Sequence, residues 1–271
     1  MSETARVTLS GLSKGFPVRG GIRPVLDDVS FTVEPGEFVS VIGPSGCGKS
    51  TAFSMLAGLD QPDAGTVTIG GEPVRPAGSG PAKCAYMPQK DLLFPWRTVL
   101  DNTTLGLEVQ GVPRKQARDK ARELFSVFGL GGFEDARPSQ LSGGMRQRAA
   151  MLRTVVQDRP VLLLDEPFGA LDSLTRTEMQ TWLQDVWQRY RWTVLMITHD
   201  IREAVYLSDR VVVLSARPAT VRREVTVVLP RPRELSMMTS PEFADVEHEL
   251  LGGVLHEESR RALVEQESAR R

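Results

Sequence analysis

The spacing of apolar residues divides the chain into regions with different expected structure. In the first part, short apolar or alternating runs (RVTLSGL, VSFTVEPGEFVSVIG, GTVTIGG) are separated by Gly, Pro and Asp, which is typical of β-strands joined by turns. From about Asp101 to Gln157 the spacing becomes helical, and the run RKQARDKARELFSVFGL places Ala117, Ala121, Leu124, Phe125 and Phe128 on one face. The pattern therefore predicts a β-rich beginning followed by a helical region.

Apolar runs and helix-like runs alternate in the second half of the chain. PVLLLDEP is followed by SLTRTEMQTWLQDVWQRY, WTVLMITHD, IREAVYLS and RVVVLS. Such alternation predicts right-handed βαβ units around a mostly parallel sheet that is covered on both faces. We expect an α/β fold with one domain over residues 1–230, into which the helical region of about 91–157 is inserted. The charged segment 231–271 is predicted to be a mostly helical, solvated tail.

Composition narrows the classes of function. The 271 residues are 41% hydrophobic and 25% charged, which is enough for one large domain with a sizeable core. The 33 basic and 34 acidic residues give a formal net charge of −1, so no nucleic-acid partner is expected. We find neither an apolar run of about 18 to 20 residues nor the layout of a signal peptide, and so expect the chain to stay in the cytosol. Cys47 and Cys84 are expected to be reduced thiols that pack in the interior.

Residues 43–51, GPSGCGKST, match the phosphate-binding pattern G-x-x-x-x-G-K-[ST] and directly follow the apolar run FVSVI. The glycines allow the backbone to wrap around a pyrophosphate, the N–H groups at the helix start point at the anion, and Lys49 adds positive charge. Ser50 is a candidate ligand of Mg²⁺. A glycine-rich turn without function would not explain why a lysine and a serine follow in register. The expected nucleotide contacts are Gly43, Pro44, Ser45, Gly46, Cys47, Gly48, Lys49, Ser50 and Thr51.

Two acidic residues end a second apolar run, VLLLDEP. Adjacent strand residues point to opposite faces, so Asp165 can face Mg²⁺ while Glu166 faces an attacking water. An ionised carboxylate in an apolar setting needs a partner, which the metal would supply. The alternative is that these acids cap a helix. Together with the glycine-rich loop, they predict a Mg²⁺-dependent nucleoside triphosphatase.

A second pair of glycines stands in LSGGMRQR, residues 141–148, at the start of another expected helix. Ser142 is a candidate helix N-cap. Each glycine weakens a helix by about 0.8 to 1 kcal/mol relative to alanine, so two in the first turn suggest that something approaches the backbone closely. A helix N-terminus without side chains is suited to an anion.

With this octet the chain resembles the ATP-binding cassette (ABC) family over about residues 5–230, with Met145 where glutamine is commoner. The resemblance implies that residues 1–230 form a nucleotide-binding domain with a P-loop core, an N-terminal antiparallel β subdomain and a helical subdomain. It implies ATP and Mg²⁺ as cofactors and a second copy of the chain as partner. Two copies would pack head to tail, so that Ser142, Gly143 and Gly144 hold the γ-phosphate of the ATP on the other copy.

The resemblance also implies roles for residues in other motifs. Gln89 would contact Mg²⁺ and the attacking water, and His199 would touch the γ-phosphate, so the expected catalytic residues are Lys49, Gln89, Glu166 and His199. Asp172, in GALDSL, would lie at the contact between the copies. Phe16 would stack on adenine. The plainer alternatives are a solvated glutamine, a structural histidine, an ordinary turn at Asp172 and core packing of Phe16.

The run that follows Gln89 indicates a docking surface. Leu92, Leu93, Phe94, Pro95 and Trp96 are apolar or aromatic residues in an expected loop, although packing in the core is an alternative. In the resembled family this region receives an integral-membrane permease, which would place the chain at the cytoplasmic face of the cell membrane.

The pattern Q-x-x-L-L-x-P-W-x-T-V-x-D-N resembles the importer branch for nitrate, sulfonate and taurine, and members proposed to import hydroxymethylpyrimidine. A solute-binding protein would then be an indirect partner. The alternative is a P-loop ATPase or kinase without a role in transport.

Overall fold

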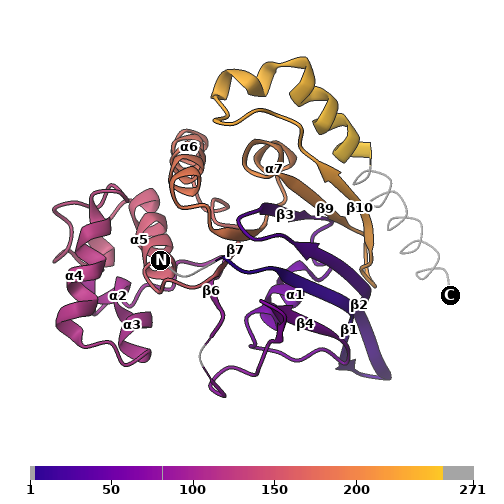
Figure 1. The fold of residues 1–271 in the computed structure, drawn as a ribbon, viewed down its shortest axis with the longest axis horizontal. Coiled ribbons are helices and arrows are strands. Elements are labelled where there is room, and N and C mark those ends of the chain that lie inside the picture. The colour runs from indigo at the N-terminus through magenta and orange to yellow at the C-terminus, as the bar shows by residue number, and fades with distance from the viewer. Residues whose placement is uncertain (1–3, 81, 253–271) are drawn as a thin grey trace.

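The computed structural model describes residues 4–80 and 82–252 (Figure 1). Its central sheet has six strands in the order β10-β9-β3-β8-β7-β6. The strands from β9 to β6 pair in parallel, and only β10 is antiparallel to its neighbour. The mostly parallel sheet expected from the alternating pattern is thus confirmed. Its strands are β3 (Phe38–Ile42), β6 (Cys84–Met87), β7 (Val161–Asp165), β8 (Thr193–Ile197), β9 (Arg210–Leu214) and β10 (Val221–Thr226).

A second sheet comes from the first part of the chain, as predicted. It is antiparallel, with four strands in the order β2-β1-β4-β5. These strands are β1 (Val7–Val18), β2 (Gly21–Val33), β4 (Ala64–Ile69) and β5 (Glu72–Pro73).

The parallel sheet separates two apolar cores. Leu162 and Leu164 of β7 belong to one core, and Val161 and Leu163 of the same strand belong to the other. Since strand residues alternate between faces, continuous apolar strands of this kind fit a sheet buried on both sides. The first core includes the helices α6 (Ser173–Tyr190) and α7 (Ile201–Leu207), and the second includes α1 (Lys49–Leu56) and the antiparallel sheet.

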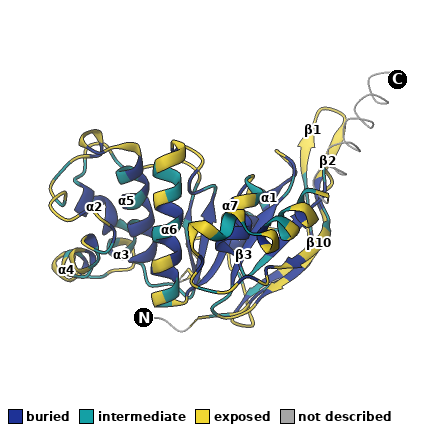
Figure 2. Ribbon diagram, turned by 90° about the horizontal axis from the view of Figure 1, so that it is seen from above, coloured by how far each residue is buried: buried dark blue, intermediate teal, exposed yellow. Residues whose placement is uncertain are grey.

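The helical region lies at one end of the molecule (Figures 1 and 2). The predicted apolar face is confirmed: Ala117, Ala121, Phe125 and Phe128 are buried, and Leu124 packs against the same core. The region contains α2 (Val99–Thr103), α3 (Leu105–Val109), α4 (Arg114–Phe125), the 3₁₀ turn η1 (Pro138–Gln140) and α5 (Gly143–Val155).

The tail differs from the solvated helix that we expected. After the 3₁₀ turn η2 (Leu235–Thr239), residues 241–252 are helical, and Phe243 and Leu250 are fully buried against the first core. Together with the half-buried Val246 they recur every three or four residues, which makes an amphipathic face within a highly charged sequence. The prediction of a solvated helix was therefore wrong for residues 231–252, and the remainder of the tail, 253–271, lies outside the described residues.

Cys47 and Cys84 are free and buried, as expected. Within 4–80 and 82–252, none of the helices has both the length and the hydropathy that a membrane span requires.

Candidate functional site

The loop between β3 and α1 is held open by glycines. Gly43, Gly46 and Gly48 have φ angles of 156°, 73° and 127°, in a range that residues with a side chain rarely adopt. A Cβ atom at Gly48 would also come within 2.7 Å of Leu26 Cδ2 in β2. Both backbone conformation and packing therefore require glycine at the start of α1.

Lys49 is the first residue of α1 and is only 7% exposed. Its Nζ donates hydrogen bonds to the carbonyl oxygens of Gly43 (2.8 Å) and Pro44 (3.1 Å), so the ammonium group lies within the curve of the loop. Ser45 and Gly46 are exposed on the loop, and in the first turn of α1 Ser50 is exposed and Thr51 is half-buried. A phosphate bound here would meet one buried cation and an exposed arc of backbone.

Arg217 was not among the predicted residues. Its Nε donates to the carbonyl oxygen of Gly46, which is 171 positions earlier in the chain. The segment that carries it follows β9 and is fixed to β2, because the Ala219 N–H donates to Val25 O (2.9 Å) and the Asp27 N–H donates to Ala219 O (2.9 Å). Arg217 thus adds positive charge beside the phosphate-binding loop. No local pattern in SARPAT indicated this contact.

Asp165 ends β7 and is 4% exposed. Burial raises the pKa of its carboxyl group, while hydrogen bonds with Ser50 and Tyr86 act in the opposite direction. The Tyr86 hydroxyl donates to Asp165 Oδ2 at 3.2 Å, a contact that the sequence did not indicate. A buried carboxylate beside a serine hydroxyl is an oxygen donor set that fits Mg²⁺, which prefers oxygen ligands.

Two predicted residues, Gln89 and His199, lie close to the carboxylate of a third, Glu166. Glu166 Oε2 accepts a hydrogen bond from Gln89 Nε2 (2.6 Å) and lies 3.7 Å from His199 Nδ1. Glu166 has a φ angle of 46°, the left-handed region, and its N–H donates to Ile197 O (3.0 Å), so the backbone that aims it is fixed by β8. The carboxylate, amide and imidazole come from three different strand ends, an arrangement suited to orienting a water molecule.

The second glycine pair has two different structural environments. Ser142 caps α5, with its Oγ accepting from the Met145 N–H (3.2 Å) as predicted. Gly143 is exposed, and a Cβ there would meet no atom closer than 4.0 Å. Gly144 is buried, and a Cβ there would lie 2.6 Å from Thr175 Cγ2 of α6. Packing of α5 on α6 thus explains Gly144, whereas space for an approaching group remains only at Gly143.

This turn lies apart from the phosphate-binding loop of the same chain. In Figure 1, α5 lies in the helical region at the left and α1 lies to the right, below the central sheet; Figure 2 likewise shows α5 at the left and α1 further to the right. Gln147 Nε2 donates to Pro167 O, which fixes α5 to the segment after Glu166. The structure therefore brings Gln89, Glu166 and His199 together but does not bring Ser142 or Gly143 to Lys49.

Asp172 and Phe16 are placed at the surface. Asp172 is exposed and caps α6, with Oδ1 accepting from the Thr175 N–H (3.1 Å). Hydrogen bonds with the Thr175 side chain and then with its backbone hold the pKa of the Asp172 carboxyl group below the usual value. Phe16 is 40% exposed on β1, with Lys14 Nζ 5.5 Å from its ring centroid. This exposure leaves a ring face of Phe16 accessible and argues against the core-packing alternative.

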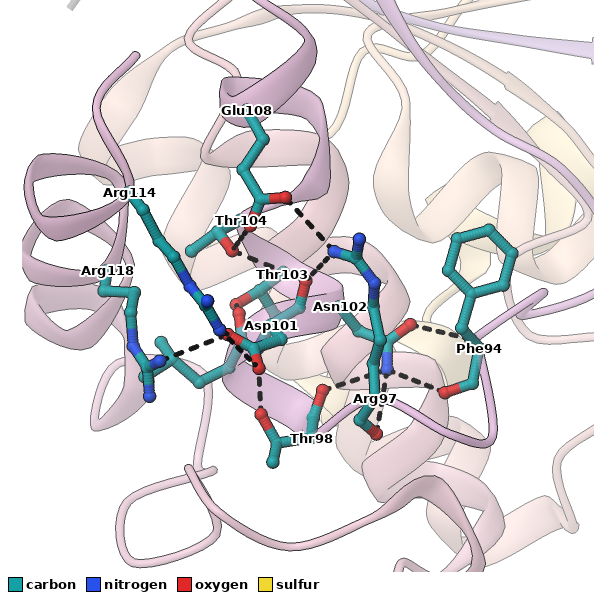
Figure 3. A network of polar contacts seen from close by, with 11 residues as sticks. Phe94, Arg97, Thr98, Asp101, Asn102, Thr103, Thr104, Glu108, Arg114 and Arg118 are labelled. Atoms are coloured by element: carbon teal, nitrogen blue, oxygen red, sulfur yellow. Dashed lines mark hydrogen bonds and ion pairs between the residues drawn. The ribbon is translucent and has the colours of Figure 1, made fainter. Parts of the chain in front are cut away.

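The segment after Gln89 is organised by buried Asn102 (Figure 3). Its Oδ1 accepts from the Phe94 N–H (2.7 Å), and its Nδ2 donates to the carbonyl oxygens of Phe94 (3.1 Å) and Thr98 (2.9 Å). Arg153 donates to Leu92 O (2.8 Å) and Asp91 O (2.5 Å) from α5. The loop is thus fixed by side chains that lie within the helical region.

The exposed part of this segment is smaller than predicted. Leu92 is 57% exposed and Trp96 is 68% exposed, and the Trp96 ring stacks on Phe94 at a centroid distance of 5.0 Å. Leu93, however, is 8% exposed and belongs to the first core, so its assignment to a surface was wrong. The apolar surface consists of Leu92, Phe94, Pro95 and Trp96.

Comparisons with a protein-family model, with related sequences and with solved structures all point to the same family. The family described as ABC transporter matches residues 26–169. The aliphatic sulfonates import ATP-binding protein of Bacillus cereus is 40% identical over 90% of this chain and 94% of its own. The nitrate import ATP-binding protein of Synechocystis is 43% identical over 87% of this chain and 90% of its own. A dimeric ATP-binding cassette solved in a post-hydrolysis state with ADP and Pi has a TM-score of 0.70 and 30% identity, covering 83% of this chain and all of that one.

The chain belongs to the ABC transporter family. It is an ATP-binding, ATP-hydrolysing cassette whose relatives include ATP-binding proteins of importers.

Proposed function

We propose that this protein is the ATPase subunit of an ABC importer and that two copies close head to tail on ATP. The main support for this proposal is that the two glycine-bearing helix starts, at α1 and at α5, lie apart in one chain. Ser142 and Gly143 are exposed at the start of α5, apart from the loop that holds Lys49. In the proposed dimer, the N-terminus of α5 in one copy would face the triphosphate bound to the other copy. It would supply the backbone N–H groups that bind an anion. The dimeric cassette that the chain resembles supports a dimer as the functional form.

Within one copy, the proposed roles follow from charge and position. Lys49 and the loop N–H groups neutralise the phosphates, since phosphoryl transfer depends on positioning and charge stabilisation more than on covalent chemistry. Glu166 orients the attacking water or accepts its proton, and Gln89 and His199 hold that carboxylate in place. We also assign His199 a contact with the γ-phosphate, which its exposed side chain permits.

Mg²⁺ would be held by Ser50 and Asp165, with Gln89 near the attacking water. When bound, the ion supplies charge to the phosphate oxygens. Ser50 and Asp165 already lie in hydrogen-bond contact, and burial raises the pKa of the Asp165 carboxyl group, which in its ionised form would need further charge compensation. A cation at this point would provide it.

The partner in the membrane is proposed from the apolar surface of Leu92, Phe94, Pro95 and Trp96. An exposed Trp96 ring stacked on the half-buried Phe94 ring, on a loop fixed by Asn102, suits a protein contact. We propose that permease subunits dock here, at the cytoplasmic face of the membrane, and that a solute-binding protein delivers cargo to them. The named relatives support a small solute of the nitrate or sulfonate class. Taurine and hydroxymethylpyrimidine are further candidates from the sequence pattern after Gln89 alone.

Glu166→Gln tests the proposal. The variant should bind ATP but not hydrolyse it, so that gel filtration with saturating Mg-ATP shows a stable dimer. Adding Gly143→Asp to Glu166→Gln should abolish the dimer without weakening ATP binding to the single copy. A Glu166→Gln protein that stays monomeric while saturated with Mg-ATP would contradict head-to-tail closure.

A further inference from the structure

A group of polar residues behind His199 is not accounted for by the proposed roles. Arg176 and Gln180 lie on α6, and Asp200 and Glu203 lie in the first turn of α7 or at its cap. We call these four residues the α6–α7 polar cluster. Together with Glu166, Phe168, Gly169, Thr198 and His199, three of them (Arg176, Asp200 and Glu203) line a small cavity.

The centre of the cluster is a buried hydrogen bond. Gln180 Nε2 donates to Glu203 Oε1 at 2.8 Å, and the two side chains are 5% and 4% exposed. Burial raises the pKa of Glu203, while hydrogen bonds with Thr198 and Gln180 oppose that rise. A buried carboxyl group that loses a donor is costly, so this contact strongly favours one relative placement of α6 and α7.

Both neighbours of His199 in the chain belong to this arrangement. The Asp200 N–H donates to Thr198 Oγ1 (3.0 Å), and Asp200 Oδ1 accepts from the Glu203 N–H (3.2 Å). Asp200 Oδ2 also lies 3.9 Å from Arg176 NH1. The His199 side chain is 57% exposed, and its Nδ1 lies 3.7 Å from Glu166 Oε2. Its placement therefore depends on the residues on either side.

The same cluster begins at the turn that carries Asp172. The Arg176 N–H donates to Asp172 O (2.9 Å), and Arg176 NH2 donates to Leu171 O (3.2 Å). The hydrogen bonds and ion pair thus run continuously from the start of α6 to the residues that flank His199.

We propose that the α6–α7 polar cluster positions His199 against Glu166 and holds it in fixed relation to the turn at Asp172, with Gln180 and Glu203 as positioning residues. This inference rests on the proposed role of His199 at the γ-phosphate. It extends that role by naming the residues that place the imidazole, none of which lies on the nucleotide loop. When two copies close, a displacement of the Asp172 turn would reach the histidine through α6 and this cluster.

Gln180→Leu is the primary test, because it removes the donor to Glu203 with little change in volume. We expect kcat for ATP hydrolysis to fall about tenfold while KM for ATP and the affinity for Mg-ATP stay within about twofold, since the nucleotide loop is untouched. A rise in KM with a parallel loss of ATP affinity, or no change in kcat, would overturn the inference.

Gln184→Leu is the matched control. Gln184 is also a buried glutamine of α6, 2% exposed, but it contacts the Arg233 backbone and the Tyr206 hydroxyl instead of the first turn of α7. It should lower the thermal unfolding midpoint as Gln180→Leu does and leave kcat near the wild-type value. Equal losses of kcat in both variants would show that the loss comes from disturbed packing of α6 and would contradict a specific positioning role for Gln180.

Two double variants separate positioning from other causes. In a His199→Ala background, Gln180→Leu should have little further effect on kcat, because it acts through the histidine. An equal fall in both backgrounds would contradict this. Gln180→Glu should lose activity by placing two carboxyl groups together, and Gln180→Glu with Glu203→Gln should recover most of it by reversing the hydrogen bond. If Glu166→Gln dimerises as expected and these variants behave like wild type, the inference fails while the proposed function stands.

Discussion

The chain has two glycine-bearing helix starts, and they are built differently. At the start of α1, glycines are imposed by left-handed backbone angles and by close packing on β2, and Lys49 lies within the loop. At the start of α5, the serine caps its own helix, one glycine packs on α6, and the other is open. The first site is complete within one chain, whereas the second presents a surface. Mutations at the first should therefore act on nucleotide binding by a single copy, and mutations at the exposed part of the second should act only when two copies meet.

The largest effect is expected from Lys49→Ala. Removing the buried cation of the loop should lower ATP turnover by about 1,000-fold, because charge on the phosphates is no longer neutralised. It should also weaken ATP binding to a single copy, measured by equilibrium titration. Near-normal binding and turnover would show that the loop N–H groups and Arg217 suffice.

Gly143→Asp should give the next largest effect, with a different signature. It should lower turnover by about 100-fold by placing negative charge where the second copy's triphosphate would lie. ATP binding to one copy should be retained, and the unfolding midpoint should not fall, because a Cβ at residue 143 meets no close atom and an acid in the first turn favours the helix. Gly143→Ala, which adds no charge, is the control and should be milder. Unchanged turnover in Gly143→Asp would remove the distinction between the two sites.

Gly144→Ala should act on stability first. The added Cβ would lie 2.6 Å from Thr175 Cγ2, so we expect the free energy of unfolding to fall by about 1 to 3 kcal/mol despite the better helix propensity of alanine. Thr175→Ser removes that methyl group and should restore most of the loss in the double variant. Chemical denaturation of the wild type, both single variants and the double variant measures these free energies of unfolding. If Thr175→Ser does not restore stability, the destabilisation does not come from a clash with the Thr175 methyl group.

The smallest effects concern two acids whose pKa values shift in opposite directions. Burial raises the pKa of Asp165 in the folded protein, so this group favours folding at acidic pH, and that contribution is lost as the pH rises through the folded-state pKa. Asp165→Asn should therefore stabilise the nucleotide-free protein more at neutral than at acidic pH. The pKa of Asp172 is lowered by its hydrogen bond to Thr175, so its contribution is present at neutral pH and lost as the pH falls through the folded-state value.

Asp172→Asn provides the comparison for that measurement, since asparagine also caps helices well. Its effect on unfolding should be small at every pH and should have the opposite pH dependence. Unfolding midpoints of wild type and both variants across the acidic range would check the signs. A stabilising effect of Asp165→Asn that grows on acidification would contradict the assignment for Asp165.

Most of the architecture could be predicted from local patterns in the sequence. Alternation and helical spacing are properties of neighbouring residues, and so the strands, the helical region and the glycine loop could be predicted from runs of sequence. Contacts across long separations could not. Arg217 meets Gly46 and Tyr86 meets Asp165 only because neighbouring strands of the parallel sheet bring them together.

Burial of single residues was the other point at which the sequence was insufficient. Leu93 and Trp96 stand in the same apolar run, but the buried amide of Asn102 folds the loop so that one enters the core and the other does not. In the tail, the charged residues concealed the spacing of Phe243 and Leu250. Gly144 looked equivalent to Gly143 until the position of α6 was known.

The C-terminal segment has a consequence for observing this protein at work. Arg233 is 3% exposed and donates to the carbonyl oxygens of Val205 (2.8 Å), Tyr206 (3.1 Å) and Ser208 (2.7 Å), while Arg202 donates to Met238 O (3.0 Å). These bonds fasten residues 233–238 to α7 along its length. Ser236 is exposed in this segment, so a spectroscopic label there would follow each tilt of the α7 helix from a residue outside the proposed nucleotide contacts.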